Sequence, residues 1–124
     1  MKGKERIFLC DDDELIVSMV SRALKKDGHE VRVKRNSDNA LAEIATWRPD
    51  VVLLDIHLDE QKSGLDILKE IKAERLDTRV IMITADDRAE SVHAAWQFGA
   101  SKYLTKPFDV EELRSAIRET GADC

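Results

Sequence analysis

Short apolar runs alternate with longer amphipathic segments along the chain. Five runs have the length of a strand and are rich in β-branched residues, at positions 7–10, 31–33, 51–54, 80–83 and 103–104. In the segments between and after them, apolar residues recur every three or four positions, as on one face of a helix. Five such alternations predict an α/β fold, namely a doubly wound five-stranded parallel sheet with helices on both faces.

Each predicted helix carries an apolar stripe that should pack on the sheet. The stripes consist of Leu15, Met19, Val20, Ala23 and Leu24; Leu41, Ile44 and Ala45; Leu65, Leu68 and Ile71; Val92, Ala95 and Trp96; and Val110, Leu113, Ala116 and Ile117. Trp96 belongs to the fourth stripe, so we expect it to cover the core together with the nearby Phe98.

Residue types that end helices support the same division of the chain. Gly28, Gly99 and Gly121 each follow a helical stretch, where a residue with positive φ commonly closes the last turn. Ser37 and Asp109 precede the second and fifth helices, where a side-chain oxygen is expected to cap free backbone N–H groups. The expected boundaries therefore agree with the apolar pattern.

Length and composition indicate one folded module. The chain has 124 residues, of which 43% are hydrophobic and 36% charged, as in globular domains. We predict a single domain over residues 1–124, with its core at about 5–120. No apolar stretch approaches the roughly 20 residues of a membrane helix, and two cysteines are too few for a disulfide framework, so we expect a cytoplasmic protein. The net charge of −5 argues against direct nucleic-acid binding by this chain.

Polar residues follow four of the predicted strands, in the groups Asp11, Asp12 and Asp13; Asp55; Thr84; and Thr105 and Lys106. Each alone is also typical of a helix cap or a solvated loop, but the carboxyl ends of parallel strands meet at one edge of the sheet, where ligands bind. Two carboxylates about 5 Å apart repel by roughly 3 kcal/mol at an effective dielectric near 20, so a cation is expected between them. Oxygen ligands without His or Cys favour Mg²⁺, with Mn²⁺ as an alternative, while the lysine and hydroxyl add donors for a phosphoryl group.

These residues lie in four of five separated motifs along the chain: I-F-L-C-D-D-D-E, V-V-L-L-D-I-H-L, G-L-D-I-L, V-I-M-I-T-A and F-G-A-S-K-Y-L-T-K-P-F. In this order, across residues 7–117, they resemble the receiver domain of two-component response regulators. The resemblance implies a flavodoxin-like, receiver-type fold. It also implies a regulatory domain rather than an enzyme, one that assists only its own phosphorylation and dephosphorylation.

The resemblance implies a phosphoacceptor and a metal site at matching positions. Asp55 corresponds to the phosphoacceptor. Asp11 and Asp12 correspond to the acidic pair that holds Mg²⁺, with Asp55 and the backbone carbonyl of His57 completing the protein ligands. Asp13 lies outside this set and is interpreted as a first-turn residue stabilised by the helix dipole.

The resemblance also implies a switch and its partners. Thr84 corresponds to the switch hydroxyl and Tyr103 to the aromatic switch, while Lys106, before a cis Pro107, pairs with the phosphoryl oxygens. The implied phosphoryl donor is a sensor histidine kinase or a histidine phosphotransfer protein. An output domain or target protein is expected on the face of the fourth helix, fifth strand and fifth helix. A phosphorylation-dependent homodimer is a further partner that the resemblance allows.

The sequence departs from the family pattern in one loop, and two residues near the acceptor lie at positions where the family varies. The family commonly has proline where Asp59 stands and one residue fewer before Gly64, so the loop after the third strand is longer and more polar. His57 and Asp86 lie two positions after the acceptor and the switch hydroxyl, at sites that vary in the family. Either their side chains tune the lifetime of the acyl phosphate, or both merely face solvent.

Two other classes of protein share part of this pattern. A flavodoxin-like cofactor binder would need a Ser/Thr/Gly-rich loop after the first strand, whereas this loop reads Asp-Asp-Asp-Glu and would repel a phosphate. An aspartate-nucleophile phosphatase would use the D-x-D formed by Asp11 and Asp13, but the chain leaves no room for a cap domain. The site of phosphoryl labelling distinguishes this alternative.

Overall fold

Five strands and five helices alternate along residues 4–121, the part of the chain that the computed structural model describes. The strands are β1 (Arg6–Cys10), β2 (Glu30–Lys34), β3 (Val51–Leu54), β4 (Arg79–Thr84) and β5 (Lys102–Thr105). The helices are α1 (Glu14–Lys26), α2 (Ala40–Trp47), α3 (Gly64–Ala73), α4 (Ala89–Gln97) and α5 (Val110–Thr120). None of these helices is long and apolar enough to cross a membrane.

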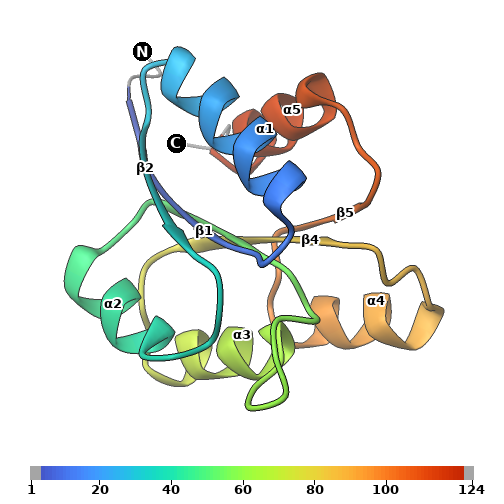
Figure 1. Cartoon of the computed structure of the whole chain (residues 1–124). Helices are drawn as coiled ribbons and strands as arrows, with labels where there is room; N and C mark the ends of the chain where they lie inside the picture. The colour runs from blue at the N-terminus through green and yellow to red at the C-terminus, as the bar shows by residue number, and fades with distance from the viewer. Residues whose placement is uncertain (1–3, 122–124) are drawn as a thin grey trace.

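All strands are parallel and lie in the order β2-β1-β3-β4-β5. Helices α1 and α5 cover one face of the sheet, and α2, α3 and α4 cover the other (Figure 1). The predicted doubly wound α/β fold is therefore confirmed. Strand order reverses between β1 and β3, and ligands of such sheets bind at the carboxyl ends of the strands at this point.

Alternate residues of the central strands build two cores. On β1, Ile7 and Leu9 pack toward α1 and α5, whereas Phe8 and Cys10 pack toward α2 and α3. All four residues of β3 are buried, because this strand has a neighbour on each side and helices on both faces. Cys10 is fully buried, and burial raises the pKa of its thiol to about 12.

Three predicted core residues are wrong, because Leu15, Ala45 and Trp96 are exposed. Leu15 is 81% exposed and Trp96 is 48% exposed. Leu15 lies in the first turn of α1, at the end where the helix passes the carboxyl edge of the sheet. On α4 the fully buried positions are the small residues Ser91 and Ala95, so Trp96 points away from them, while Phe98 packs partly against the core as expected.

The predicted helix ends are correct at four positions, although one of the three glycines lacks the expected positive φ, and wrong at Ser37. Gly28 and Gly99 have φ of 95° and 99°, and Asp109 caps α5 in a reciprocal capping box. Gly121 follows α5 with a φ of −104°, so it needs no glycine-specific conformation. Ser37 does not cap α2, because that helix begins further along, behind an asparagine in the left-handed conformation.

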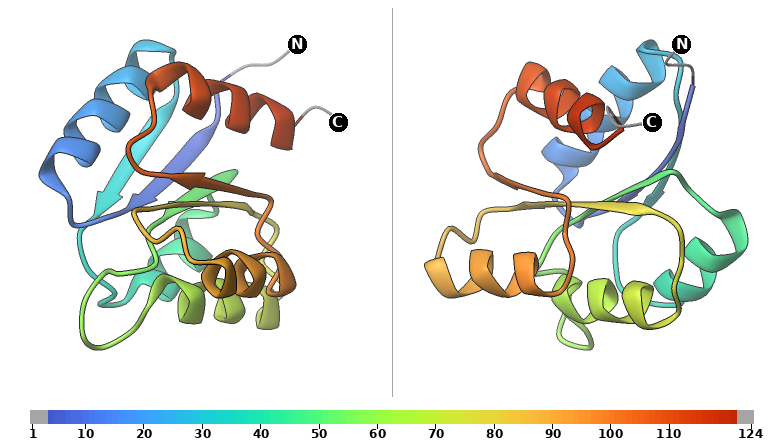
Figure 2. Two further views of the ribbon diagram at one scale, coloured as in Figure 1. Left: turned by 90° about the vertical axis from the view of Figure 1, so that its right-hand side faces the viewer. Right: turned by 180° about the vertical axis from the view of Figure 1, so that it is seen from behind.

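Strand β5 forms one edge of the sheet and lies between α4 and α5 (Figure 2). Its residues are only partly buried or exposed, in contrast to those of β3. Lys102 on β5 pairs with Glu119 on α5, so an ion pair links the strand and the helix on this face. Strand β5 is therefore the partly exposed centre of the face that it forms with α4 and α5.

Candidate functional site

Three carboxylates meet where β1 and β3 end. Cys10 and Leu54 are partners in the parallel register, and the Asp55 N–H donates to the Cys10 carbonyl at 3.0 Å, which sets Asp11 and Asp55 side by side. Ligand oxygens of Asp11, Asp12 and Asp55 lie within 4.8 Å of one another. Asp11 and Asp55 are buried, at 0% and 5% exposure, whereas Asp12 faces solvent.

Lys106 places its ammonium group between the two buried carboxylates. Its Nζ lies 2.9 Å from Asp11 Oδ2 and 3.0 Å from Asp55 Oδ2. The Lys106 N–H donates to the Thr84 carbonyl at 2.8 Å, and the following bond to Pro107 is cis, as expected. Burial alone would lower the pKa of Lys106, but the hydrogen bonds and charges of Asp11 and Asp55 raise it. The lysine is therefore held in its charged form.

One lysine does not balance this acidic cluster. Three carboxylates and one ammonium group carry a formal charge of −2. Asp11 Oδ2 is buried, and Lys106 Nζ is its one ion-pair partner within residues 4–121. Burial raises the pKa of Asp11, against the opposing effects of the Asp13 N–H and Lys106. An oxygen-only cluster with spare negative charge suits a hard divalent cation.

Asp13 stands just before α1 rather than in its first turn. Its side chain accepts hydrogen bonds from the N–H groups of Leu15 and Ile16, at 3.0 and 3.3 Å, and so caps the helix. Its Oδ2 also lies 4.0 Å from Lys106 Nζ. The first-turn interpretation was therefore wrong by one position, and the capping role explains why the residue is acidic.

Thr84 and Tyr103 meet at the backbone of Asp86. Thr84 is fully buried, and its hydroxyl accepts a hydrogen bond from the Asp86 N–H at 3.3 Å. The Tyr103 hydroxyl donates to the Asp86 carbonyl. Burial and the nearby Asp86 charge raise the pKa of Tyr103 to about 12, so the phenol remains a donor. The two expected switch residues are thus joined through a third residue.

The Asp86 side chain is buried and extensively hydrogen-bonded, so the solvent-facing alternative is wrong for this residue. Its carboxylate accepts from His57 Nε2 at 2.8 Å, from Ser91 Oγ at 2.8 Å and from the backbone and guanidinium of Arg88. The hydrogen bonds from Arg88, above all, hold the pKa of Asp86 well below its usual range, although burial opposes them. His57 itself has a side chain that is 63% exposed.

The longer loop after β3 is anchored by Asp59. Its carboxylate accepts from the N–H and hydroxyl of Ser37, at 2.7 and 3.0 Å, and from the N–H groups of Gln61 and Lys62. These hydrogen bonds, led by that of the Ser37 N–H, lower the pKa of Asp59. Where the family commonly has a proline, Asp59 therefore stabilises a turn and links it by hydrogen bonds to the loop between β2 and α2.

The same loop brings the start of α3 very close to the backbone at the end of β3. A Cβ added at Gly64 would lie 1.9 Å from the Asp55 carbonyl oxygen, which no side chain tolerates. The Gly64 N–H donates to the Ile56 carbonyl at 2.7 Å. Glycine in the third motif is therefore required by the close approach of the two backbones.

Sequence reasoning missed several polar partners of the site, namely Ser37, Arg88 and Ser91. The only available signals were positional: Asp59 replaces a proline, and Asp86 stands two residues after Thr84. Neither signal specifies which side chain donates a hydrogen bond to the Asp59 or Asp86 carboxylate.

Comparison with known proteins agrees with the fold and with the motifs. The family model described as "Response regulator receiver domain" matches residues 7–118. The probable transcriptional regulatory protein TcrX of Mycobacterium tuberculosis is 36% identical over 119 residues, covering 93% of this chain and 50% of TcrX. The regulatory protein AtoC of Escherichia coli is 36% identical over 118 residues, covering 95% of this chain and 25% of AtoC. The chain thus spans half or less of the length of these relatives.

Solved structures are similar over nearly the whole chain. A CheY-like response regulator receiver domain protein from Methanospirillum hungatei superimposes with a TM-score of 0.90 at 26% identity, covering 98% of this chain and 96% of that one. The response regulator DrrB of Thermotoga maritima gives 0.84 at 32% identity, covering 97% of this chain and 54% of DrrB. The chain therefore belongs to the receiver domain family of two-component response regulators.

Proposed function

We propose that this domain takes a phosphoryl group onto Asp55 from a sensor histidine kinase or a histidine phosphotransfer protein. The observation that carries the proposal is a buried Asp55 carboxylate, 3.0 Å from the Lys106 ammonium group and beside the acidic pair Asp11 and Asp12. The carboxylate oxygen attacks the phosphorus of phosphohistidine, a P–O bond forms as the P–N bond breaks, and the imidazole leaves.

The charges around Asp55 suit phosphoryl transfer. Asp11, Asp12, Asp55 and the backbone carbonyl of His57 would hold Mg²⁺, which when bound neutralises charge on the transferring phosphoryl group. Lys106 lies within reach of the same oxygens and supplies a fixed positive charge in a largely dry site. The protein thus contributes the positions of the reacting groups and the positive charge that neutralises the phosphoryl oxygens.

Thr84 and Tyr103 are the proposed switch. A new phosphoryl group would attract the Thr84 hydroxyl, which now accepts from the Asp86 N–H, and Tyr103 is joined to the same residue. The resulting change would reach α4, β5 and α5, the proposed surface for an output domain, a target protein or a second copy of this chain. A bias of roughly 5.5 kcal/mol moves a two-state equilibrium from 1:99 to 99:1.

We take residues 1–124 as one receiver domain with its core at about 5–120.

Labelling with acetyl phosphate and Mg²⁺ tests the acceptor. The intact protein should gain the mass of one phosphoryl group, labile to hydroxylamine as an acyl phosphate is, and Asp55→Asn should not be labelled. Asp13→Asn is a control, because it changes a neighbouring carboxylate that caps α1. Label on Asp11 instead of Asp55 would support the aspartate-nucleophile phosphatase alternative and overturn the proposal.

Thermal unfolding with and without Mg²⁺ tests the metal site. A cation that binds the folded state stabilises it by about 1.4 kcal/mol at roughly ten times its Kd. Asp12→Ala should lose this stabilisation, because Asp12 is the exposed member of the acidic cluster and the least involved in folding. Glu14→Ala, at a neighbouring exposed acid paired with Arg35, should keep it. An unchanged Mg²⁺ response in Asp12→Ala would remove Asp12 from the site.

A further inference from the structure

Asp86 reaches both expected switch residues and the acceptor loop. Its N–H donates to the Thr84 hydroxyl at 3.3 Å, and its carbonyl accepts from the Tyr103 hydroxyl. Its carboxylate oxygen Oδ2 accepts from His57 Nε2 at 2.8 Å. His57 lies two residues after Asp55, so this contact spans the gap between the loops that follow β3 and β4. One residue therefore touches three separate segments around the acceptor.

The same carboxylate fixes the beginning of α4. Oδ1 accepts from the Arg88 N–H and Nε, both at 3.1 Å, and Oδ2 accepts from Arg88 Nη2 and Ser91 Oγ, both at 2.8 Å. Arg88 is the residue before α4 and provides no side-chain cap of its own, so the Asp86 carboxylate is the acidic group that holds Arg88 and Ser91 at this helix end. Ser91 is buried in the first turn of α4.

We propose that Asp86 is a positioning residue that couples the acceptor loop to α4 and Tyr103. The set that it joins, His57, Thr84, Arg88, Ser91 and Tyr103, is hereafter the Asp86 network. The inference rests on the proposed function and deepens it by naming the residue through which the change at Asp55 is transmitted.

The contacts suggest how the coupling operates. When Thr84 turns its hydroxyl toward a phosphoryl group, the hydrogen bond from the Asp86 N–H must lengthen or the Asp86 backbone must follow. Because the carbonyl of the same residue holds Tyr103 and its side chain holds Arg88, a shift of this backbone displaces β5 and the start of α4 together. His57 resists the shift from the acceptor side, since its ring is bonded to the same oxygen as Arg88.

Asp86 differs sharply from its neighbour Asp87. Asp86 is 8% exposed and makes side-chain hydrogen bonds with three residues, whereas Asp87 is exposed. Replacing either by alanine removes one negative charge at almost the same place in the chain. Asp87→Ala is therefore a matched control for charge, and Asp86→Asn keeps the size of the side chain and one acceptor oxygen.

Hydrogen exchange of the resting protein tests the first half of the proposal, without any phosphoryl mimic. Asp86→Ala should speed exchange by about threefold or more both in residues 56–59 and in residues 88–92, because the network holds both segments closed. Asp87→Ala should match the wild type, and Asp86→Asn should lie between. Faster exchange confined to residues 88–92 would make Asp86 a simple helix cap and would overturn the coupling.

Adding beryllofluoride and Mg²⁺ tests the second half. In the wild type, exchange should change near Asp55, in α4 and in β5. In Asp86→Ala the change near Asp55 should persist while that in α4 and β5 falls to roughly a third or less, a split that general destabilisation would not produce. A full response of α4 in this variant overturns the proposal. If the wild type shows no response at all, the proposed function fails, and the resting-state comparison still decides the coupling.

Discussion

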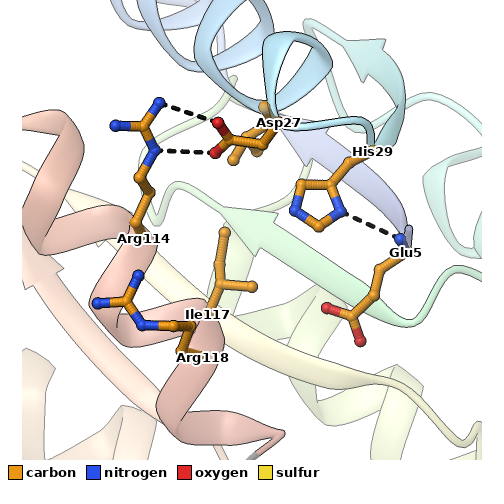
Figure 3. A pocket seen from close by; sticks show the side chains of 7 residues that line it. Glu5, Asp27, His29, Arg114, Ile117 and Arg118 are labelled. Atoms are coloured by element: carbon orange, nitrogen blue, oxygen red, sulfur yellow. Dashed lines mark hydrogen bonds and ion pairs between the residues drawn. The ribbon is translucent and has the colours of Figure 1, made fainter. Parts of the chain in front are cut away.

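The two ends of the parallel sheet both gather charged side chains, but only one end leaves them unbalanced. At the amino end, a pocket of about 270 Å³ lies between α1 and α5 (Figure 3). Asp27 accepts from Arg114 Nε and Nη2 at 2.8 and 3.0 Å, and His29 Nδ1 accepts from the Glu5 N–H at 3.0 Å. The Glu5 carboxylate pairs with Arg79. Each acidic group of this pocket thus has its own cation.

At the carboxyl end, three carboxylates gather, and only the two buried ones pair with Lys106 among the described residues. The difference shows that a hollow is a weaker indication of function than charge that the fold has buried without balancing it. Paired charges at the amino end contribute to the packing of α1 and α5. The surplus of negative charge at the carboxyl end produces repulsion that a divalent cation can relieve.

Among substitutions that test the difference between the two ends, the one at Lys106 is expected to lower the free energy of unfolding most. Lys106→Met removes the cation between Asp11 and Asp55, and without divalent ions it should lower the free energy of unfolding by about 2–3 kcal/mol, near the lower end for loss of one partner of a buried ion pair. Mg²⁺ should restore part of the loss by supplying another positive charge. Urea unfolding with and without Mg²⁺ measures both effects.

The control for Lys106→Met is Lys102→Met. Lys102 pairs with Glu119 on the surface, with side chains 38% and 59% exposed, so its loss should be well under 1 kcal/mol and should not respond to Mg²⁺. Equal losses in the two variants would mean that the carboxyl end is no less balanced than the surface, and would contradict the contrast drawn above.

A smaller effect of opposite sign is expected at Asp11. Burial, above all, raises its pKa, so the folded state holds the proton more tightly than the unfolded chain does. Stability without Mg²⁺ should therefore decrease as the pH rises from 3.8, the ordinary pKa of the group, through the raised value in the fold. Asp11→Asn cannot ionise and should gain about 1 kcal/mol at neutral pH. Urea midpoints across this pH range measure the difference, and a variant less stable than wild type at neutral pH would show that the Lys106 ion pair outweighs desolvation.

The fold and the centre of the site were predictable because both depend on short-range patterns. The β-branched runs specify buried strands, and parallel strands bring the residues that follow them to one edge whatever the loops do. Asp11, Asp55 and Lys106 therefore converge in the structure as the strand ends indicated. Helix periodicity likewise identified the faces of α1 and α5 that pack on the sheet.

What escaped prediction depends on loop geometry. Whether Asp59 forms a hydrogen bond with Ser37, or Asp86 with His57, is decided by how loops that are distant in sequence turn toward one another. Periodicity also shows which way a helical residue points but not how far the helix extends past the sheet, which is why Leu15 is exposed. These are tertiary properties that no local pattern contains.

The smallest effect is expected at the amino end, at the ion pair of Arg114 and Asp27 in the pocket shown in Figure 3. Arg114→Gln leaves Asp27 without its two hydrogen bonds, but both side chains are 28% exposed, so water replaces the lost partner. The loss of stability should be less than half of that in Lys106→Met and should shrink further as salt is added, because exposed charges are screened. Arg118→Gln, which removes a guanidinium bonded only to Ser115 Oγ among residues 4–121, is the control and should lose less still. Mg²⁺ should not rescue either variant, since the amino end has no surplus of carboxylates to hold it. A loss in Arg114→Gln as large as that in Lys106→Met, or one that Mg²⁺ reverses, would show that the two ends of the sheet do not differ in the way their charges are balanced.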